Sequence, residues 1–208
     1  MHRRVLDIPV EAPRAVVLRL LGVRGRPPRE SLSRIIDEEL ACAGELVEPL
    51  VVIGTRQGLP GSATIDPQLP VALAVCTLGP ALGARVDAHT QGGESARAMV
   101  LDAVGSAMVE DLADRANGRI CRLALAAGSK PALRRSPGYG SWAIEEQRLI
   151  FELLEPAEIG VTLSESCLMD PEKSISFLVP LTGGEPGKRA RSRCDRCGFA
   201  GCGHRESS

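Results

Sequence analysis

The stretch that decides the fold spans residues 134–180 and reads RRSPGYGSWAIEEQRLIFELLEPAEIGVTLSESCLMDPEKSISFLVP. A rigid Pro-Gly turn opens it, and an amphipathic segment ending near Leu154 predicts a helix. Residues 159–163 and 174–179 predict two strands around a polar elbow, and we expect the second to return antiparallel to the first. Two arginines and the only tyrosine of the chain surround the turn, which favours a site for a small polar molecule over a core element.

Helical and strand patterns alternate in the rest of the chain. A continuous apolar run at residues 71–78 predicts a strand buried on both faces. Residues 94–126 carry an apolar stripe at helical spacing, which predicts a helix about 45–50 Å long at about 1.5 Å per residue. Shorter patterns predict further strands at residues 3–10 (an edge strand) and 49–55, and further helices at residues 15–21, 29–46 and about 81–91.

Composition excludes several classes of protein. The chain has 208 residues, with 25 basic and 26 acidic side chains and 2% aromatic residues, so neither a basic surface nor a base-stacking platform for nucleic acid is expected. No apolar run reaches membrane-spanning length and the N-terminus lacks the pattern of a signal peptide, which predicts a cytoplasmic protein. We then expect buried free thiols, not disulfides, at four scattered cysteines: Cys42, Cys76, Cys121 and Cys167.

Polar side chains recur every four residues along the long helix, at Asp102, Ser106, Glu110 and Asp114. Such a stripe is typical of a solvated helix face. The alternative is that one of these acids faces a pocket and pairs with a cationic group of a ligand.

A cobalamin-type pattern, D-x-H-x-x-G, occurs at Asp87, His89 and Gly92. In a cobalamin site it would follow a strand and precede a helix. Here the preceding residues are helical in character and Gly92 is a helix-ending residue. We therefore expect the match to be a coincidence.

Three motifs in order carry a family resemblance: R-x-S-P-G-Y-G at residues 134–140, Q-x-x-I-F-x-L-L at 147–154, and I-G-V-x-L-S-E-S-x-x-M-x-P-x-K-S-I-S at 159–176. Together they resemble the reactivation domain of cobalamin-dependent methionine synthase. The likeness is close over about 45 residues and looser over residues 70–130. It implies an α+β fold: a single domain, residues 1–182, with a mainly antiparallel twisted sheet packed by long helices.

The resemblance also implies a site for S-adenosylmethionine (AdoMet). Arg134 would bind the methionine carboxylate and Glu110 the ammonium group. The turn would contact the adenosine end through Ser136, Pro137, Gly138 and Tyr139. Glu165 and Ser166 would line the same cleft or face the corrin.

A stand-alone domain of this kind would act on a cobalamin or corrinoid held by a partner, such as a methionine synthase lacking its own activation domain. A flavodoxin or ferredoxin would supply electrons, and the domain would support reductive remethylation of the cofactor. Two alternatives stay open: a metal-clipped interaction module for a corrinoid protein, without AdoMet turnover, and a self-contained methyltransferase. The second lacks a glycine-rich nucleotide loop after a strand.

The C-terminus has a composition of its own. Residues 183–193 form a Gly/Pro/basic linker, and residues 194–208 hold three cysteines and a histidine within eleven residues. This donor set suits a tetrahedral zinc ion or one edge of an iron–sulfur cluster. The predicted ligands are Cys194, Cys197, Cys202 and His204.

Overall fold

The structure is a computed structural model, and it describes residues 2–23 and 27–182. Its helices are α1 (Arg14–Leu20), α2 (Glu30–Ala43), α3 (Ala81–Gln91), α4 (Ser95–Ala126) and α5 (Gln147–Leu154), with 3-10 turns at Gly44–Leu46, Ile144–Glu146 and Pro156–Ile159. Its strands are β1 (His2–Asp7), β2 (Leu50–Gln57), β3 (Pro70–Thr77), β4 (Lys130–Pro131), β5 (Thr162–Leu163), β6 (Met169–Asp170) and β7 (Ser174–Thr182). These elements form one α+β domain, as predicted.

The main sheet has the strand order β1-β2-β3-β7-β4, and every neighbouring pair is antiparallel. The first strand lies at an edge, as predicted, with Val5 opposite Val52. In the centre, Ala74 of β3 lies opposite Phe177 of β7.

Alternation along the central strands divides the core into two layers, because successive side chains of a strand point to opposite faces. Ala72, Ala74 and Cys76 of β3 pack on the face covered by α1–α4, together with Phe177 and Val179 of β7. The intervening residues pack on the other face with Trp142 and the apolar side of α5; on β3 and β7 they are Val71, Leu73, Val75 and Leu178. The prediction that this apolar run is buried on both faces is confirmed.

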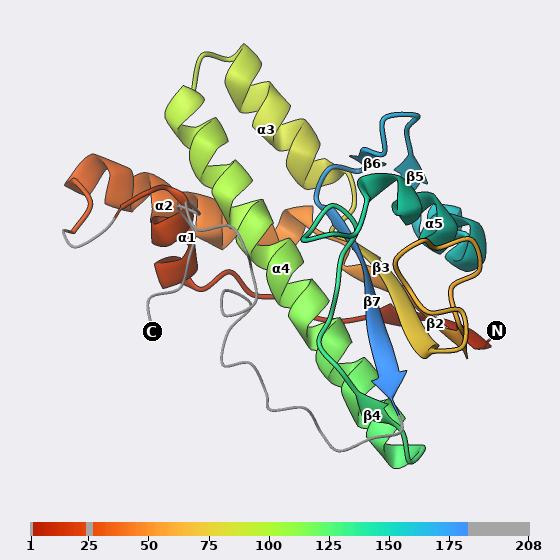
Figure 1. The fold of residues 1–208 in the computed structure, drawn as a ribbon. Helices are drawn as coiled ribbons and strands as arrows, with labels where there is room; N and C mark the ends of the chain where they lie inside the picture. The colour runs from red at the N-terminus through yellow and green to blue at the C-terminus, as the bar shows by residue number, and fades with distance from the viewer. Residues whose placement is uncertain (1, 24–26, 183–208) are drawn as a thin grey trace.

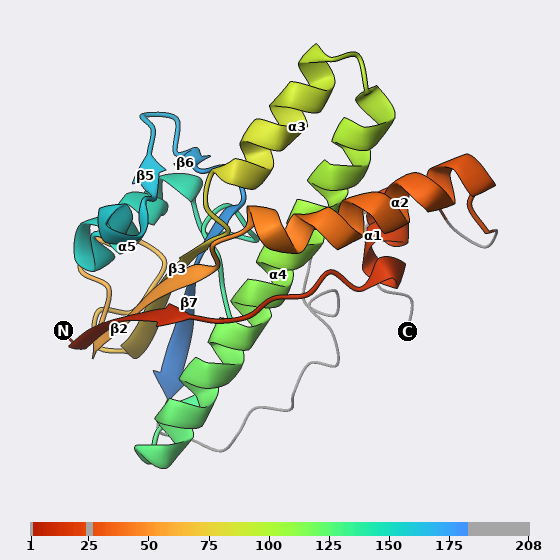
Figure 2. The ribbon, with the colours of Figure 1, turned by 180° about the vertical axis from the view of Figure 1, so that it is seen from behind.

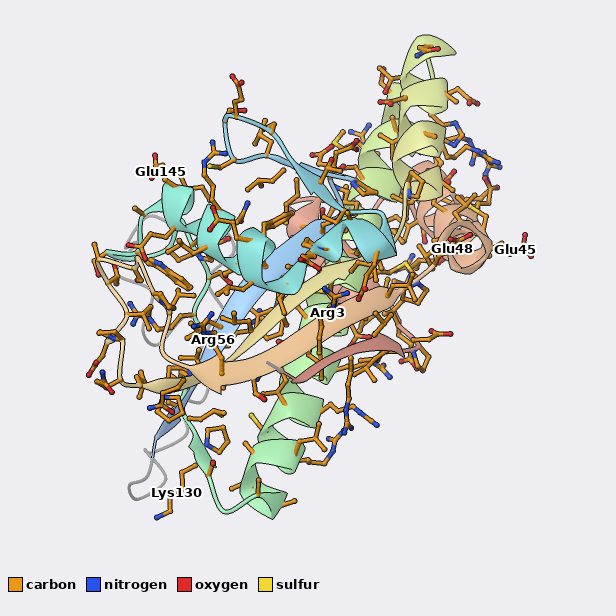
Figure 3. The ribbon with its side chains drawn as sticks, turned by 90° about the vertical axis from the view of Figure 1, so that its right-hand side faces the viewer. Arg3, Glu45, Glu48, Arg56, Lys130 and Glu145 are labelled. Carbon is orange, nitrogen blue, oxygen red and sulfur yellow. The ribbon has the colours of Figure 1, made fainter. Side chains whose placement is uncertain are left out.

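The long helix α4 runs across one face of the sheet, and α3 lies antiparallel beside its first half (Figures 1 and 2). Its residues 95–126 include no proline, and α3 ends at Gly92 and Gly93, the latter with a φ of 76°. On the other face, α5 covers the sheet (Figure 3). Arg3, on the edge strand β1, reaches the end of α5 from the sheet. The Arg3 guanidinium donates to the Leu154 carbonyl at 3.1 Å and so ties β1 to the end of α5.

The polar elbow differs from the prediction. β5 does not pair with β7; it pairs with β6 in a short hairpin, so residues 169–170 of the predicted elbow form a strand. β7 pairs with β3 instead. The long apolar β7 buries more surface in the main sheet than it would beside the short β5, and this explains the change of partner.

No helix of the described residues is long and apolar enough to cross a membrane.

Candidate functional site

The loop that follows α4 is fastened to β7. The Ala132 amide donates to the Pro180 carbonyl at 2.8 Å, and Arg135 and Leu178 exchange two backbone hydrogen bonds of 2.8 Å each. These bonds fix the backbone on both sides of Arg134. Its side chain points toward α4.

Arg134 meets two carboxylates of the polar stripe on α4. Its Nη2 lies 3.2 Å from Oε2 of Glu110, and its Nη1 lies 3.6 Å from Oδ1 of Asp114. The guanidinium carbon lies 5.1 Å from the centroid of the Phe177 ring. The Arg134 side chain is 11% exposed, whereas the Glu110 side chain is 44% exposed. The site is thus a largely buried cation held between a ring and two acids that solvent can reach.

The two halves of the polar stripe have different partners. Lys173, which precedes β7, places its Nζ 2.6 Å from Oδ1 of Asp102 and 3.2 Å from Oγ of Ser106. Glu110 and Asp114 instead face Arg134. The stripe is therefore an ion-pairing edge that binds two cations from the β7 side of the fold, and a wholly solvated face is excluded.

The Pro-Gly turn stands beside Arg134. Pro137 is buried and Ser136 is half-buried, whereas Gly138 and Tyr139 are exposed. Gly138 has a φ of 85° and donates its amide to the Trp142 carbonyl at 2.8 Å, which closes the turn. Tyr139 is 70% exposed, so its ring is accessible to a partner or ligand.

The two aromatic residues of this loop differ in burial: Tyr139 is exposed and Trp142 is buried. Trp142 is 1% exposed and belongs to the core, and its Nε1 donates to Oε2 of Glu146 at 2.8 Å. The Arg135 guanidinium lies 5.8 Å from the Trp142 ring centroid. Arg135 therefore supports the loop through a cation–π contact, a role that the sequence did not indicate.

Sequence reasoning also missed Glu146. Its carboxylate accepts hydrogen bonds from the Ser62 hydroxyl, from the Thr64 hydroxyl at 3.1 Å and from the Ala63 amide at 3.3 Å, in addition to Trp142. It thus joins the turn before α5 to the loop between β2 and β3. One feature of the sequence could have indicated this contact: Glu146 follows the only tryptophan of the chain by four residues, about one helical turn.

Glu165 and Ser166 lie at the tip of the β5–β6 hairpin. The Ser164 and Ser166 hydroxyls lie 3.0 Å apart, and the Leu168 amide donates to Ser164 Oγ at 3.0 Å. The Glu165 side chain is exposed. Within residues 2–23 and 27–182, no hydrogen bond or ion pair joins these two residues to Arg134, so they form a separate polar tip.

The contacts of His89 hold helices together. It lies in the last turn of α3, with Nδ1 2.7 Å from Oε2 of Glu94 and Nε2 3.8 Å from Oε2 of the buried Glu39. A cobalamin-ligating histidine would need a loop after a strand, whereas this one fastens α3 to α2 and α4. The helical context agrees with the expectation that the D-x-H-x-x-G match is a coincidence.

The predicted metal ligands Cys194, Cys197, Cys202 and His204 lie outside the described residues. Inside them, no group of three or more His, Cys, Asp or Glu side chains could hold a metal ion.

The four scattered cysteines are free thiols, as predicted, but only two are buried. Cys76 and Cys167 lie in the interior, while Cys42 and Cys121 are half-buried. Burial raises the pKa of the Cys76 thiol to about 12, so that thiol is neutral and unreactive at physiological pH.

Comparison with known proteins identifies the fold. No protein-family model and no curated protein matches the chain. A solved structure does match: the crystal structure of the MetH reactivation domain bound to AdoHcy, with a TM-score of 0.67 and 14% sequence identity, over 91% of this chain and 81% of that one. The chain therefore has the fold of that reactivation domain.

Proposed function

We propose that the chain is an AdoMet-binding subunit that supports reductive remethylation of a cobalamin or corrinoid cofactor on a partner protein. The observation that carries the proposal is the Arg134–Glu110 pair, at 3.2 Å, beside the turn whose motif resembles the family's ligand loop. The likeness of the fold to a reactivation domain bound to AdoHcy supports the same ligand class.

An α-amino acid group is the chemical complement of this pair. Its carboxylate matches the planar guanidinium of Arg134, and its ammonium matches the Glu110 carboxylate. Insertion of the zwitterion exchanges one ion pair for two. Asp114 and the Phe177 ring keep contact with the guanidinium during the exchange and hold it in place.

The turn is suited to the other end of the ligand. Exposed Gly138 and Tyr139 offer a backbone edge and a flat ring, which are the groups that contact a purine or ribose. Ser136 and Pro137 fix the position of that edge.

The chain itself contributes binding and orientation. The partner's corrinoid supplies the cobalt nucleophile, and a donor such as flavodoxin or ferredoxin supplies the electron that generates it. Arg134, Glu110 and the turn hold the methyl donor in one orientation, which is the main contribution that positioning makes to a methyl transfer. We place Glu165 and Ser166, at the exposed hairpin tip, toward the corrin protein. A cytoplasmic location is consistent with this set of partners.

A second candidate is a metal-clipped interaction module that binds the corrinoid protein without AdoMet turnover. The four donors between Cys194 and His204 favour it. Metal analysis after anaerobic purification distinguishes a colourless zinc protein from one with the visible absorbance, iron and sulfide of a cluster.

The test is anaerobic purification of the tagged chain with its partners, followed by spectroscopy. We expect a corrinoid protein in the eluate, and conversion of its spectrum to the methylated form only when reductant and AdoMet are both added. Arg134→Gln should retain the partner and lose the conversion. Partner capture without conversion in the wild type would favour the second candidate, and an eluate free of corrinoid would contradict both.

A further inference from the structure

A groove lies between the second half of α4 and the segment that leaves β1. Figure 2 shows this segment crossing α4 on its way to α1. The groove has a volume of about 490 Å³. Sites for small molecules commonly measure about 300–1,000 Å³, so the groove is large enough for an organic ligand and much larger than one ion.

One wall is cationic. Arg115, Arg119 and Arg122 line it and lie near one face of α4, spaced by four and three residues. Asp114 is the one acidic residue on this wall, and it pairs with Arg134. Arg115 already binds carboxylates: its Nε lies 2.6 Å from Oδ2 of Asp111, and its Nη2 lies 3.6 Å from Oε1 of Glu11.

Arg119 and Arg122 differ from Arg115. Neither makes an ion pair or a side-chain hydrogen bond with any other residue in the part of the chain that the structure describes. Gly118 opens the floor between them: a Cβ atom there would lie 3.6 Å from Nη1 of Arg122. The wall therefore presents two guanidinium groups, one helical turn apart, over a surface without a side chain.

The opposite wall has a different chemistry. It is formed by Asp7, Ile8 and Pro9. A carboxylate accepts hydrogen bonds from hydroxyl groups and repels a second carboxylate, and the two apolar residues can contact a carbon skeleton. Guanidinium forks on the facing wall match phosphate oxygens bidentately.

The geometry points to a binding site for a small hydroxylated organic phosphate, such as a sugar phosphate. The phosphate binds Arg119 and Arg122, and the hydroxyl groups bind Asp7. This site borders the Arg134 site, because Asp114 lines the groove and also pairs with Arg134, but its phosphate-binding groups are different residues. The inference does not depend on the proposed function.

The test is a titration of the full chain with ribose 5-phosphate at 0.15 M salt, followed by amide NMR and thermal stability. We expect saturable shifts at Ile8 and Gly118, no binding of ribose, and at least tenfold weaker binding of inorganic phosphate. Arg119→Gln/Arg122→Gln should weaken binding at least tenfold. Gly118→Leu should do the same by filling the floor, since it leaves both charges in place.

The matched control is Arg29→Gln/Arg34→Gln, which removes two exposed arginines at the start of α2. It should bind ribose 5-phosphate as the wild type does. Failure of the wild type to saturate would overturn the proposal. If the control lost affinity for ribose 5-phosphate equally, the effect would come from net charge and not from this groove. Equal affinity for inorganic phosphate would mean an adventitious ion only.

Discussion

At the residue scale, Glu146 is the side chain that holds the loop before α5 against the rest of the domain. Burial raises the pKa of its carboxyl, but the hydrogen bonds from Ser62, Trp142, Thr64 and the Ala63 amide outweigh burial. The pKa therefore lies below its ordinary value of 4.5. A lowered pKa means that the ionised form stabilises the folded state.

We expect Glu146→Gln to lower the free energy of unfolding by about 1–3 kcal/mol at neutral pH, because hydrogen bonds to a charged acceptor are replaced by weaker ones. The stabilisation is complete above the ordinary pKa of 4.5 and is lost as the pH falls through the lower folded pKa. The difference between wild type and variant should therefore shrink below about pH 4.5. Urea denaturation between pH 3 and 7 measures it.

The exposed neighbour Glu145 provides the control. Glu145→Gln should change the unfolding free energy by less than about 0.5 kcal/mol, as surface substitutions usually do. Equal losses in the two variants would contradict the role assigned to the Glu146 hydrogen bonds.

Arg134 and Arg135 show what a residue-level pattern can and cannot predict. The resemblance to a known loop predicted a ligand-binding role for Arg134 and not for Arg135, and the structure brings Arg134 to Glu110, 24 positions earlier in the chain. No local pattern could have indicated that Arg135 lies over Trp142 or that Glu146 binds residues 62–64. These contacts depend on loops that meet only after the sheet has formed.

At the element scale, α4 contains two glycines whose replacement by alanine should change the stability of the domain in opposite directions. A Cβ on Gly105 would lie 2.6 Å from Cδ2 of Leu82, which is fully buried, and 3.3 Å from Cε of Lys173. The same atom on Gly118 would meet only Arg122, at 3.6 Å. The first glycine is required by packing and the second is not.

Gly105→Ala should therefore destabilise the domain by about 1–3 kcal/mol, since overpacking outweighs the gain in helix propensity. Gly118→Ala should stabilise it by up to about 1 kcal/mol through that same propensity. Chemical denaturation of the two variants measures both effects. A stabilising Gly105→Ala would show that α3 does not pack on α4 as described.

Elements with a strong internal pattern were predictable. The 32-residue helix α4 was expected at nearly its observed bounds, because its apolar stripe is long and glycines mark its start. The β5–β6 hairpin was not expected, because strands of two residues are too short to show an alternation. The pairing of β7 with β3 was missed for another reason: strand pairing is set by burial across the whole sheet, not by neighbours in the chain.

At the scale of the whole molecule, the domain predicted at residues 1–182 contains both core layers. We expect a chain ending at Thr182 to fold with the melting temperature of the full chain within about 2 °C, and to bind AdoMet equally. It should lose any bound metal. Calorimetric scanning and metal analysis of both proteins check this; a large fall in melting temperature would show that residues 183–208 complete the fold.

The most direct test of the central claim is titration calorimetry of the full chain with AdoMet. The account predicts a dissociation constant on the order of micromolar, weakened at least tenfold by Arg134→Gln through the loss of charge-assisted hydrogen bonds. Arg135→Gln, next to it in the same loop, should bind within about threefold of the wild type, because its cation–π contact contributes only about 0.5–1 kcal/mol to the loop. Absence of AdoMet binding to the wild type, or equal losses in the two variants, would contradict the account.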